Sequence, residues 1–106
     1  MKRDLLQLRS DLPLESYLRE CASEVDTALD RLLPKASAKP PTIHRAIRYS
    51  LFAGGKRMRP ILCLAAAEAC GASYDNAIFP ACAVECVHTY SLIHDDLPCM
   101  DDEDLR

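Results

Sequence analysis

Apolar residues recur along most of the chain at steps of three and four, which is the spacing of one face of an α-helix. The first such segment, 14–33, has apolar positions at Leu14, Tyr17, Leu18, Cys21, Val25, Ala28, Leu29 and Leu32. Pro13 marks its start and Pro34 its stop, because proline fits a first turn but cannot continue a helix. We predict one long amphipathic helix here, followed by a lysine- and proline-rich loop over 35–41.

Two shorter helices are predicted in the middle of the chain. The first begins at Thr42, which would cap it, and is ended by the glycine pair 54–55. The second opens at Pro60, a residue suited to a first turn, and runs to Cys70. Because this second helix is apolar on nearly all sides, we expect it at the centre of a helical assembly that the chain alone cannot fully cover.

A fourth predicted helix begins near Asn76 or Ala77, carries Pro80 in its first turn and continues to about Asp96. No segment shows the pattern of a strand. Hydrophobic residues make up 49% of the sequence but aromatic residues only 6%, so the core material is mainly leucine, isoleucine, alanine and cysteine. These features predict an all-α fold with short connections.

Charge is distributed unevenly along the sequence. The formal net charge is −3, yet six of the sixteen acidic residues lie among the last twelve residues, which leaves the rest slightly basic. Such an acidic end is either a solvated tail or a cation site, and the spacing of its acids decides between the two.

The six cysteines do not indicate a disulfide scaffold. The start of the chain has no apolar signal segment, and its longest apolar stretch is far too short to span a bilayer. Cys63 and Cys70, and Cys82 and Cys86, fall within apolar helical segments, where we expect reduced core thiols. A zinc site is disfavoured because His88, two residues after Cys86, would face away on a helix. We therefore expect a cytosolic protein without stable membrane insertion.

The segment 54–60, Gly-Gly-Lys-Arg-Met-Arg-Pro, joins two predicted helices and is a candidate anion site. Its glycines let the backbone approach a ligand closely. Lys56, Arg57 and Arg59 supply three positive charges beside the free N–H groups of a helix start, and such groups suit phosphate. A solvated basic loop or a short nucleic-acid patch is the alternative.

The segment 94–104, His-Asp-Asp-Leu-Pro-Cys-Met-Asp-Asp-Glu-Asp, is a candidate magnesium site. Mg²⁺ prefers one or two carboxylates together with phosphate and water. On a straight helix Asp101 would face away from Asp95, but Pro98 breaks the helix, so a local loop can return Asp101 beside Asp95. The candidate ligands are Asp95 and Asp101, with Asp96 beside them; a solvated tail is the alternative, and an EF-hand does not fit the spacing.

His88 precedes Asp95 by seven residues, which is almost two helical turns. The two side chains therefore share a face about 10 Å apart. That separation suits a metal-bound phosphate at one end and a second anion deeper in the site. A hydrogen-bonded core or rim histidine is the alternative.

Three segments together resemble one known family. They are 54–60, then 85–94 (Glu-Cys-Val-His-Thr-Tyr-Ser-Leu-Ile-His), and 95–101. The sequence over about 14–106 is similar to the trans-isoprenyl diphosphate synthases, especially the bacterial and plastid-type farnesyl and geranylgeranyl diphosphate synthases. The resemblance implies the amino-terminal helices of the terpenoid synthase-like bundle, with 1–106 an incomplete part of one domain.

The family's second aspartate-rich motif is not present in these 106 residues. We therefore expect the chain to be part of a longer enzyme and to show no turnover when expressed alone. The resemblance also implies a homodimer.

The resemblance implies a role for each candidate residue. The diphosphate of isopentenyl diphosphate would be held by Gly55, Lys56, Arg59 and His88. The Mg²⁺-dependent catalytic group would comprise Asp95, Asp96 and Asp101, with Asp95 and Asp101 as metal ligands, and Arg106 would bind the allylic diphosphate. Magnesium would stabilise the departing diphosphate while the double bond of isopentenyl diphosphate attacks the allylic cation, and a proton is then lost.

Product length is predicted from Tyr90 and Ser91, which lie five and four residues before Asp95. In the family a bulky residue there closes the floor of the tail pocket. Tyr90, with the two-residue expansion of the motif around Pro98, predicts farnesyl diphosphate; methionine or a smaller residue would favour geranylgeranyl diphosphate. Tyr90 as an ordinary core residue is the alternative.

Two other classes of protein remain open for the whole chain. One is a non-catalytic prenyl synthase-like helical subunit. The other is a nucleic-acid binder that uses the basic turn, which the acidic end disfavours because it would repel a phosphate backbone.

Overall fold

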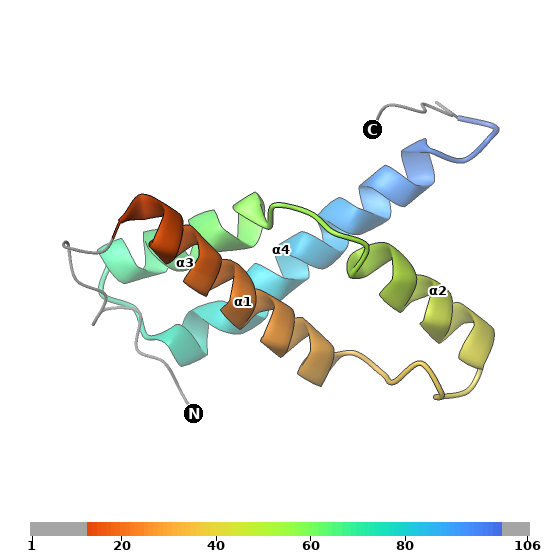
Figure 1. The fold of residues 1–106 in the computed structure, drawn as a ribbon, viewed down its shortest axis with the longest axis horizontal. Coiled ribbons are helices and arrows are strands. Elements are labelled where there is room, and N and C mark those ends of the chain that lie inside the picture. Colours follow the sequence, from red (N-terminus) through yellow and green to blue (C-terminus); the bar gives the residue numbers. More distant parts are fainter. Residues whose placement is uncertain (1–12, 101–106) are drawn as a thin grey trace.

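Residues 13–100 are described by the computed structural model, and within them the chain forms four helices (Figure 1). The helices are α1 (Leu14–Leu32), α2 (Pro41–Leu51), α3 (Met58–Ala69) and α4 (Tyr74–Asp95). The prediction of an all-α fold is confirmed.

The long helix α4 is the axis on which the other helices pack (Figure 1). Helix α3 packs most extensively against α4, α1 packs against both of them, and α2 makes its main contacts with α4. The largest fully buried side chains include Leu29 of α1, Leu64 of α3 and Ile78 of α4, so the core lies where these three helices meet. Leu51 at the end of α2 is also buried, which ties the basic turn to this core.

Helix α1 has the predicted position to within one residue, and Arg48 of α2 covers its end. The Arg48 guanidinium donates hydrogen bonds to the carbonyl oxygens of Asp30, Leu33 and Pro34 at 2.9, 3.1 and 2.8 Å. It also pairs with the Asp30 carboxylate at 2.7 Å. These bonds satisfy carbonyl groups that a helix end leaves without partners, and they hold α2 to α1.

The predicted boundaries of α2 and α3 are corrected by the structure. Thr42 is not an N-cap, because the helix already begins at Pro41 and no side chain caps it. It ends at Leu51, so the glycine pair 54–55 lies beyond the helix rather than at its last turn. Helix α3 begins at Met58, which places Pro60 inside the first turn rather than at its start.

Helix α4 begins earlier than predicted because Ser73 caps it. The side-chain oxygen of Ser73 accepts a hydrogen bond from the N–H of Asn76 at 3.3 Å, a contact typical of an N-cap. Pro80 is therefore in the second turn rather than the first, where it costs the helix one backbone hydrogen bond.

All six cysteines are free thiols, and their burial differs widely. Cys21 and Cys82 are buried, Cys63 and Cys86 are partly buried, and Cys70 and Cys99 are exposed. Burial raises the pKa of Cys82 to about 11 and also raises the pKa of Cys86, so both thiols are neutral packing groups near pH 7. The prediction of a core thiol holds for Cys82 and is wrong for Cys70, which lies at the exposed end of α3.

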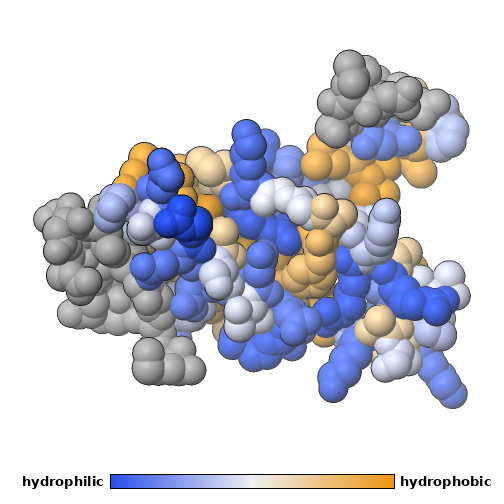
Figure 2. All heavy atoms as spheres, in the orientation of Figure 1, coloured by the Kyte–Doolittle hydropathy of each residue, from blue (hydrophilic) through white to orange (hydrophobic). Residues whose placement is uncertain are grey.

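Much apolar surface stays exposed on residues 13–100. Leu62 of α3 is 61% exposed and Val87 of α4 is 66% exposed, although both lie in the middle of apolar helices. Figure 2 shows further apolar side chains at the surface near the C-terminal end of α4. The expectation that the apolar helix after Pro60 is not fully covered therefore holds for α3 within the described residues. None of the helices within 13–100 is long and apolar enough to cross a membrane.

Candidate functional site

The basic turn between α2 and α3 contains three positive φ angles: 113° at Gly54, 157° at Gly55 and 57° at Arg57. Glycine adopts such angles readily, whereas a left-handed residue with a side chain costs about 1–2 kcal/mol. A Cβ built on Gly54 or Gly55 would meet no atom within 4 Å. The backbone conformation, rather than a lack of space, therefore requires glycine, and this side of the turn is open to a ligand.

The side chain of Arg57 is buried beneath the backbone of the turn, and the residue is only 6% exposed. Its Nη1 donates to Glu85 Oε2 at 2.7 Å, its Nε to Asp26 Oδ1 at 2.8 Å and its Nη2 to the carbonyl oxygen of Leu51 at 2.6 Å. Burial by itself would lower the pKa of the guanidinium, but the hydrogen bonds to Glu85 and Asp26 outweigh burial and raise it. The three positive charges predicted for the turn are thus not equivalent, because two carboxylates neutralise the charge of Arg57.

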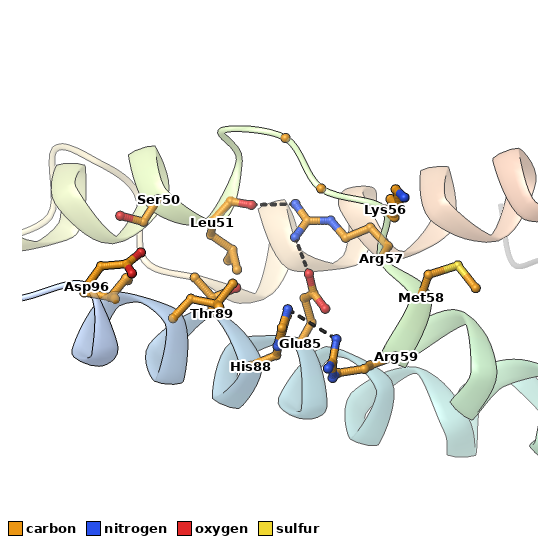
Figure 3. A pocket seen from close by; sticks show the side chains of 14 residues that line it. Ser50, Leu51, Lys56, Arg57, Met58, Arg59, Glu85, His88, Thr89 and Asp96 are labelled. Atoms are coloured by element: carbon orange, nitrogen blue, oxygen red, sulfur yellow. Dashed lines mark hydrogen bonds and ion pairs between the residues drawn. The ribbon is translucent and has the colours of Figure 1, made fainter. Parts of the chain in front are cut away.

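A cleft of about 360 Å³ lies between this turn and α4 (Figure 3). Lys56, Arg59 and His88 line it at one end, and Ser50 and Asp96 at the other. Arg59 Nη1 lies 3.3 Å from His88 Nε2. Because an arginine N–H only donates, Nε2 is the acceptor in this contact. The structure thus brings together the predicted residues Gly55, Lys56, Arg59 and His88.

The start of α3 adds to the positive character of this end. No side chain caps the first turn of α3, which begins at Met58 directly after the basic turn. Helix starts carry free N–H groups and the positive end of the helix dipole, and both favour anions. With Lys56 and Arg59 on the same cleft, this end suits a phosphate or diphosphate group.

The other end of the cleft carries Asp96, which follows the last residue of α4 and has φ −88° and ψ 0°. Asp95 was expected to share a face with His88, but it is Asp96 that lines the cleft with this histidine. The carboxylate of Asp95 is half exposed and lies 3.4 Å from His94 Nδ1. A cationic end and an acidic end therefore face the same cleft.

Comparison with known proteins identifies the family. The model of the polyprenyl synthetase family matches residues 40–106. The chain belongs to the polyprenyl synthetase family. That match includes the basic turn, α3, α4 and the aspartate-rich segment.

Among curated relatives, this polyprenyl synthetase chain is 58% identical over 90 residues to the chloroplastic geranylgeranyl pyrophosphate synthase of Capsicum annuum. That alignment covers 85% of the chain and 24% of the relative. The chloroplastic heterodimeric geranylgeranyl pyrophosphate synthase large subunit 1 of Arabidopsis thaliana is 54% identical over 97 residues, covering 92% and 26%. The chain thus spans about a quarter of the length of these relatives.

Solved structures give the same picture of the fold. An FPP/GFPP synthase from Zymomonas mobilis superposes with a TM-score of 0.78 at 38% identity, covering 88% of this chain and 34% of that one. A geranyltransferase from Legionella pneumophila gives a TM-score of 0.79 at 39% identity, covering 87% and 32%. The four helices therefore match part of the prenyl synthase fold.

The acidic end of this polyprenyl synthetase site offers donors that fit magnesium. Asp95 and Asp96 supply hard carboxylate oxygens at the negative end of the α4 dipole, and Mg²⁺ needs only one or two protein carboxylates beside phosphate and water. No group of three or more His, Cys, Asp or Glu side chains that could hold a metal occurs within 13–100. Asp101 and Arg106 lie outside these residues, as does the predicted return of the loop after Pro98.

The predicted product-length residues lie on α4 away from the cleft. Tyr90 is 65% exposed and its ring lies 5.9 Å from the ring of His94, so it is not a core residue of the described chain. Ser91 Oγ donates to the carbonyl oxygen of His88 at 2.7 Å. Ser91 also lines a second, apolar hollow with Val87, and Arg59 and His88 form part of the wall of both the cleft and this hollow.

Sequence reasoning missed Glu85 and Thr89 of α4 and Ser50 of α2 as residues of the cleft. The sequence does carry a signal for Glu85, because it is a lone acid in an apolar helical segment. In the structure it is only 4% exposed. A buried carboxylate needs a cationic or hydrogen-bonding partner, and Arg57 is that partner. Ser50 and Thr89 carry no comparable signal.

Proposed function

We propose that this chain forms the amino-terminal part of a Mg²⁺-dependent trans-prenyltransferase, which joins isopentenyl diphosphate to an allylic diphosphate. The observation that carries the proposal is the cleft with Lys56, Arg59 and His88 at one end and Asp96 at the other. Two diphosphate substrates need two separate anion sites, one bound directly by cationic groups and one bound through metal. The cleft offers the chemistry of both ends in one space.

In the proposed enzyme the cationic end binds isopentenyl diphosphate. Lys56 and Arg59 neutralise its diphosphate, the open backbone at Gly55 allows a close approach, and His88 orients Arg59 through the 3.3 Å contact. These residues bind and align the substrate so that its double bond lies near the reacting carbon, and they need not move a proton.

The acidic end of the proposed enzyme holds Mg²⁺ and the allylic diphosphate. Asp95 and Asp96 would hold the metal, with Asp101 as a further ligand and Arg106 on the allylic diphosphate. Bound Mg²⁺ would supply Lewis-acid stabilisation of the negative charge that develops on the leaving diphosphate.

For the product we propose geranylgeranyl diphosphate rather than the farnesyl diphosphate expected from the sequence. The support is the names of the curated relatives, which are geranylgeranyl pyrophosphate synthases at 50–58% identity. Farnesyl diphosphate is the second candidate, because Tyr90 is a bulky residue five positions before Asp95.

A direct assay tests this proposal in the complete enzyme that contains the chain. Labelled isopentenyl diphosphate is supplied with Mg²⁺ and, in turn, dimethylallyl, geranyl and farnesyl diphosphate, and the products are separated by chromatography. We expect condensation with all three and a C20 end product. A C15 end product would support the second candidate, and no condensation with any partner would reject the proposed function.

A substitution of Tyr90 tests its role in product length. If its ring limits the growing chain, Tyr90→Ala should lengthen the end product by at least one C5 unit, while Tyr49→Ala, an exposed tyrosine on α2, should leave it unchanged. Chromatography of the dephosphorylated products measures this. The same product from Tyr90→Ala and the parent would remove Tyr90 from the product-length pocket.

We also propose a homodimer, and the cytosol as the compartment. The relative from Capsicum annuum and the first large subunit from Arabidopsis thaliana are named chloroplastic, so the plastid is the alternative compartment. The same Arabidopsis relative is named heterodimeric, which makes a second, different subunit the alternative to a homodimer.

A further inference from the structure

We propose that Arg57 and Glu85 are positioning residues, which hold the basic turn in the conformation that binds diphosphate; this inference rests on the function proposed above. Arg57 stands in the turn between Lys56 and the first turn of α3, which carries Arg59. Its side chain points away from Lys56 into the protein, toward Glu85 and Leu51 (Figure 3).

The guanidinium of Arg57 joins three helices at the base of the turn. It binds the carbonyl oxygen of Leu51 at the end of α2, Asp26 on α1 and Glu85 on α4, all within 2.8 Å. A guanidinium has five donors in a rigid plane, so one group can satisfy three acceptors in different directions, which an ammonium on a flexible stem does not reproduce with the same geometry. These three hydrogen bonds, which we call the anchor, hold the turn to each of the three helices.

The left-handed conformation of Arg57 connects this anchor to the backbone of the site. At φ 57° Arg57 is the left-handed residue directly before α3, and from there its side chain runs inward to Glu85 and Leu51 while Lys56 and Arg59 line the cleft. An arginine at such an angle persists when surrounding contacts hold it there. The three hydrogen bonds provide those contacts.

Glu85 connects the anchor to the functional face of α4. It precedes His88 by three residues and Thr89 by four, so these side chains share one face of the helix, and all three line the cleft. The Arg57–Glu85 bond therefore fixes the position of the turn relative to His88. The 3.3 Å contact between Arg59 and His88 depends on that position.

Arg48 provides a control, because it shares with Arg57 the ring of Phe52 and an aspartate partner on α1. Both guanidinium groups lie over the ring of Phe52, at 5.6 Å for Arg48 and 5.9 Å for Arg57. Arg48 also bonds an aspartate of α1, at Asp30, but it does not line the cleft. Loss of Arg48 should loosen the same region without moving the turn against α4.

The test compares four variants of the complete enzyme: Arg57→Lys, Arg57→Gly, Glu85→Gln and Arg48→Lys. We expect Arg57→Lys to raise KM for isopentenyl diphosphate by at least about tenfold, because small misplacements of binding groups are costly, with KM for the allylic substrate changed less than about twofold. Glu85→Gln should act in the same direction. Arg57→Gly removes the backbone strain but also the anchor, so it should raise KM as well.

Arg48→Lys should lower the melting temperature, yet leave KM for isopentenyl diphosphate unchanged. Unchanged KM in Arg57→Lys and Glu85→Gln, with only a lower melting temperature, would overturn the inference. So would an equal rise of KM in Arg48→Lys, or a normal KM in Arg57→Gly.

Calorimetry with inorganic pyrophosphate gives a readout that needs no turnover. Arg57→Lys should weaken pyrophosphate binding by at least about tenfold relative to the parent, and Arg48→Lys should not. An enzyme that binds pyrophosphate in this pattern but condenses no substrate would reject the proposed function and keep the positioning role. Equal pyrophosphate binding in all variants would overturn the positioning role alone.

Discussion

Replacing Asp95 or Asp96 with asparagine should lower the Mg²⁺-dependent kcat/KM of the complete enzyme by about 10²–10³-fold, the largest effect we expect from a change in the described residues. Asparagine keeps the size of the side chain but removes the negative charge that a hard cation requires. Both residues lie at the negative end of the α4 dipole, where a cation is further favoured. Fewer carboxylates mean weaker metal binding and less stabilisation of the leaving diphosphate.

A magnesium titration separates the two effects of such a substitution. If metal binding is weakened, excess Mg²⁺ should restore part of the activity, whereas a loss of leaving-group stabilisation persists at saturation. Asp75→Asn is the matched control, because it removes an exposed aspartate at the opposite end of the same helix and should leave kcat/KM unchanged. Parent-like kinetics in both Asp95→Asn and Asp96→Asn would remove these residues from the metal site.

The second large effect concerns the cationic end of the cleft. Lys56→Ala should raise KM for isopentenyl diphosphate by about 10–100-fold, because a hydrogen bond to a charged group contributes about 1.5–3 kcal/mol and each 1.4 kcal/mol is tenfold in affinity. Arg59→Ala should have at least the same effect, since it also removes the partner of His88. The KM of the allylic substrate should change much less.

Steady-state kinetics with each substrate varied in turn measures this selectivity. Lys39→Ala, an exposed lysine in the loop between α1 and α2, is the control for a general loss of positive charge and should not change either KM. Raising the salt concentration should increase KM for isopentenyl diphosphate less in Lys56→Ala than in the parent, because one screened attraction is gone. Equal losses for the two substrates would contradict the assignment of this end of the cleft.

The number, order and approximate positions of the helices could be predicted because apolar periodicity and proline punctuation act over short stretches of chain. The ends were less predictable, since each depends on which local hydrogen bond forms. The sequence predicts that α4 begins near Asn76 or Ala77, but it begins at Tyr74, because the side-chain oxygen of Ser73 accepts a hydrogen bond from the N–H of Asn76. Thr42 is a good capping residue type, but the helix begins one residue before it.

The candidate site divides in the same way. Its residue types and their spacing identified the two ends of the cleft. The family resemblance assigned Arg59 rather than Arg57 to the substrate, but the burial of Arg57 was not predictable from the residue pattern, because its partners Asp26 and Glu85 lie on α1 and α4, 31 and 28 residues away. Whether Asp95 or Asp96 faces the cleft depends on how the chain leaves α4, which no periodicity describes.

His88 lies on α4 and Asp96 directly follows it, so one helix sets the distance between the two ends of the cleft, and this limits how the sequence can change. His88 and Asp96 are separated by a stretch of α4 that rises about 1.5 Å and turns about 100° per residue. The loss or gain of one residue between them would move Asp96 by only about 1.5 Å along the helix axis, but would rotate it by about 100° away from the face that carries His88. A substitution in this stretch can keep the spacing of the two ends, whereas an insertion or a deletion changes it. The number of residues between His88 and Asp96 therefore has to stay constant for the two ends to face the same cleft.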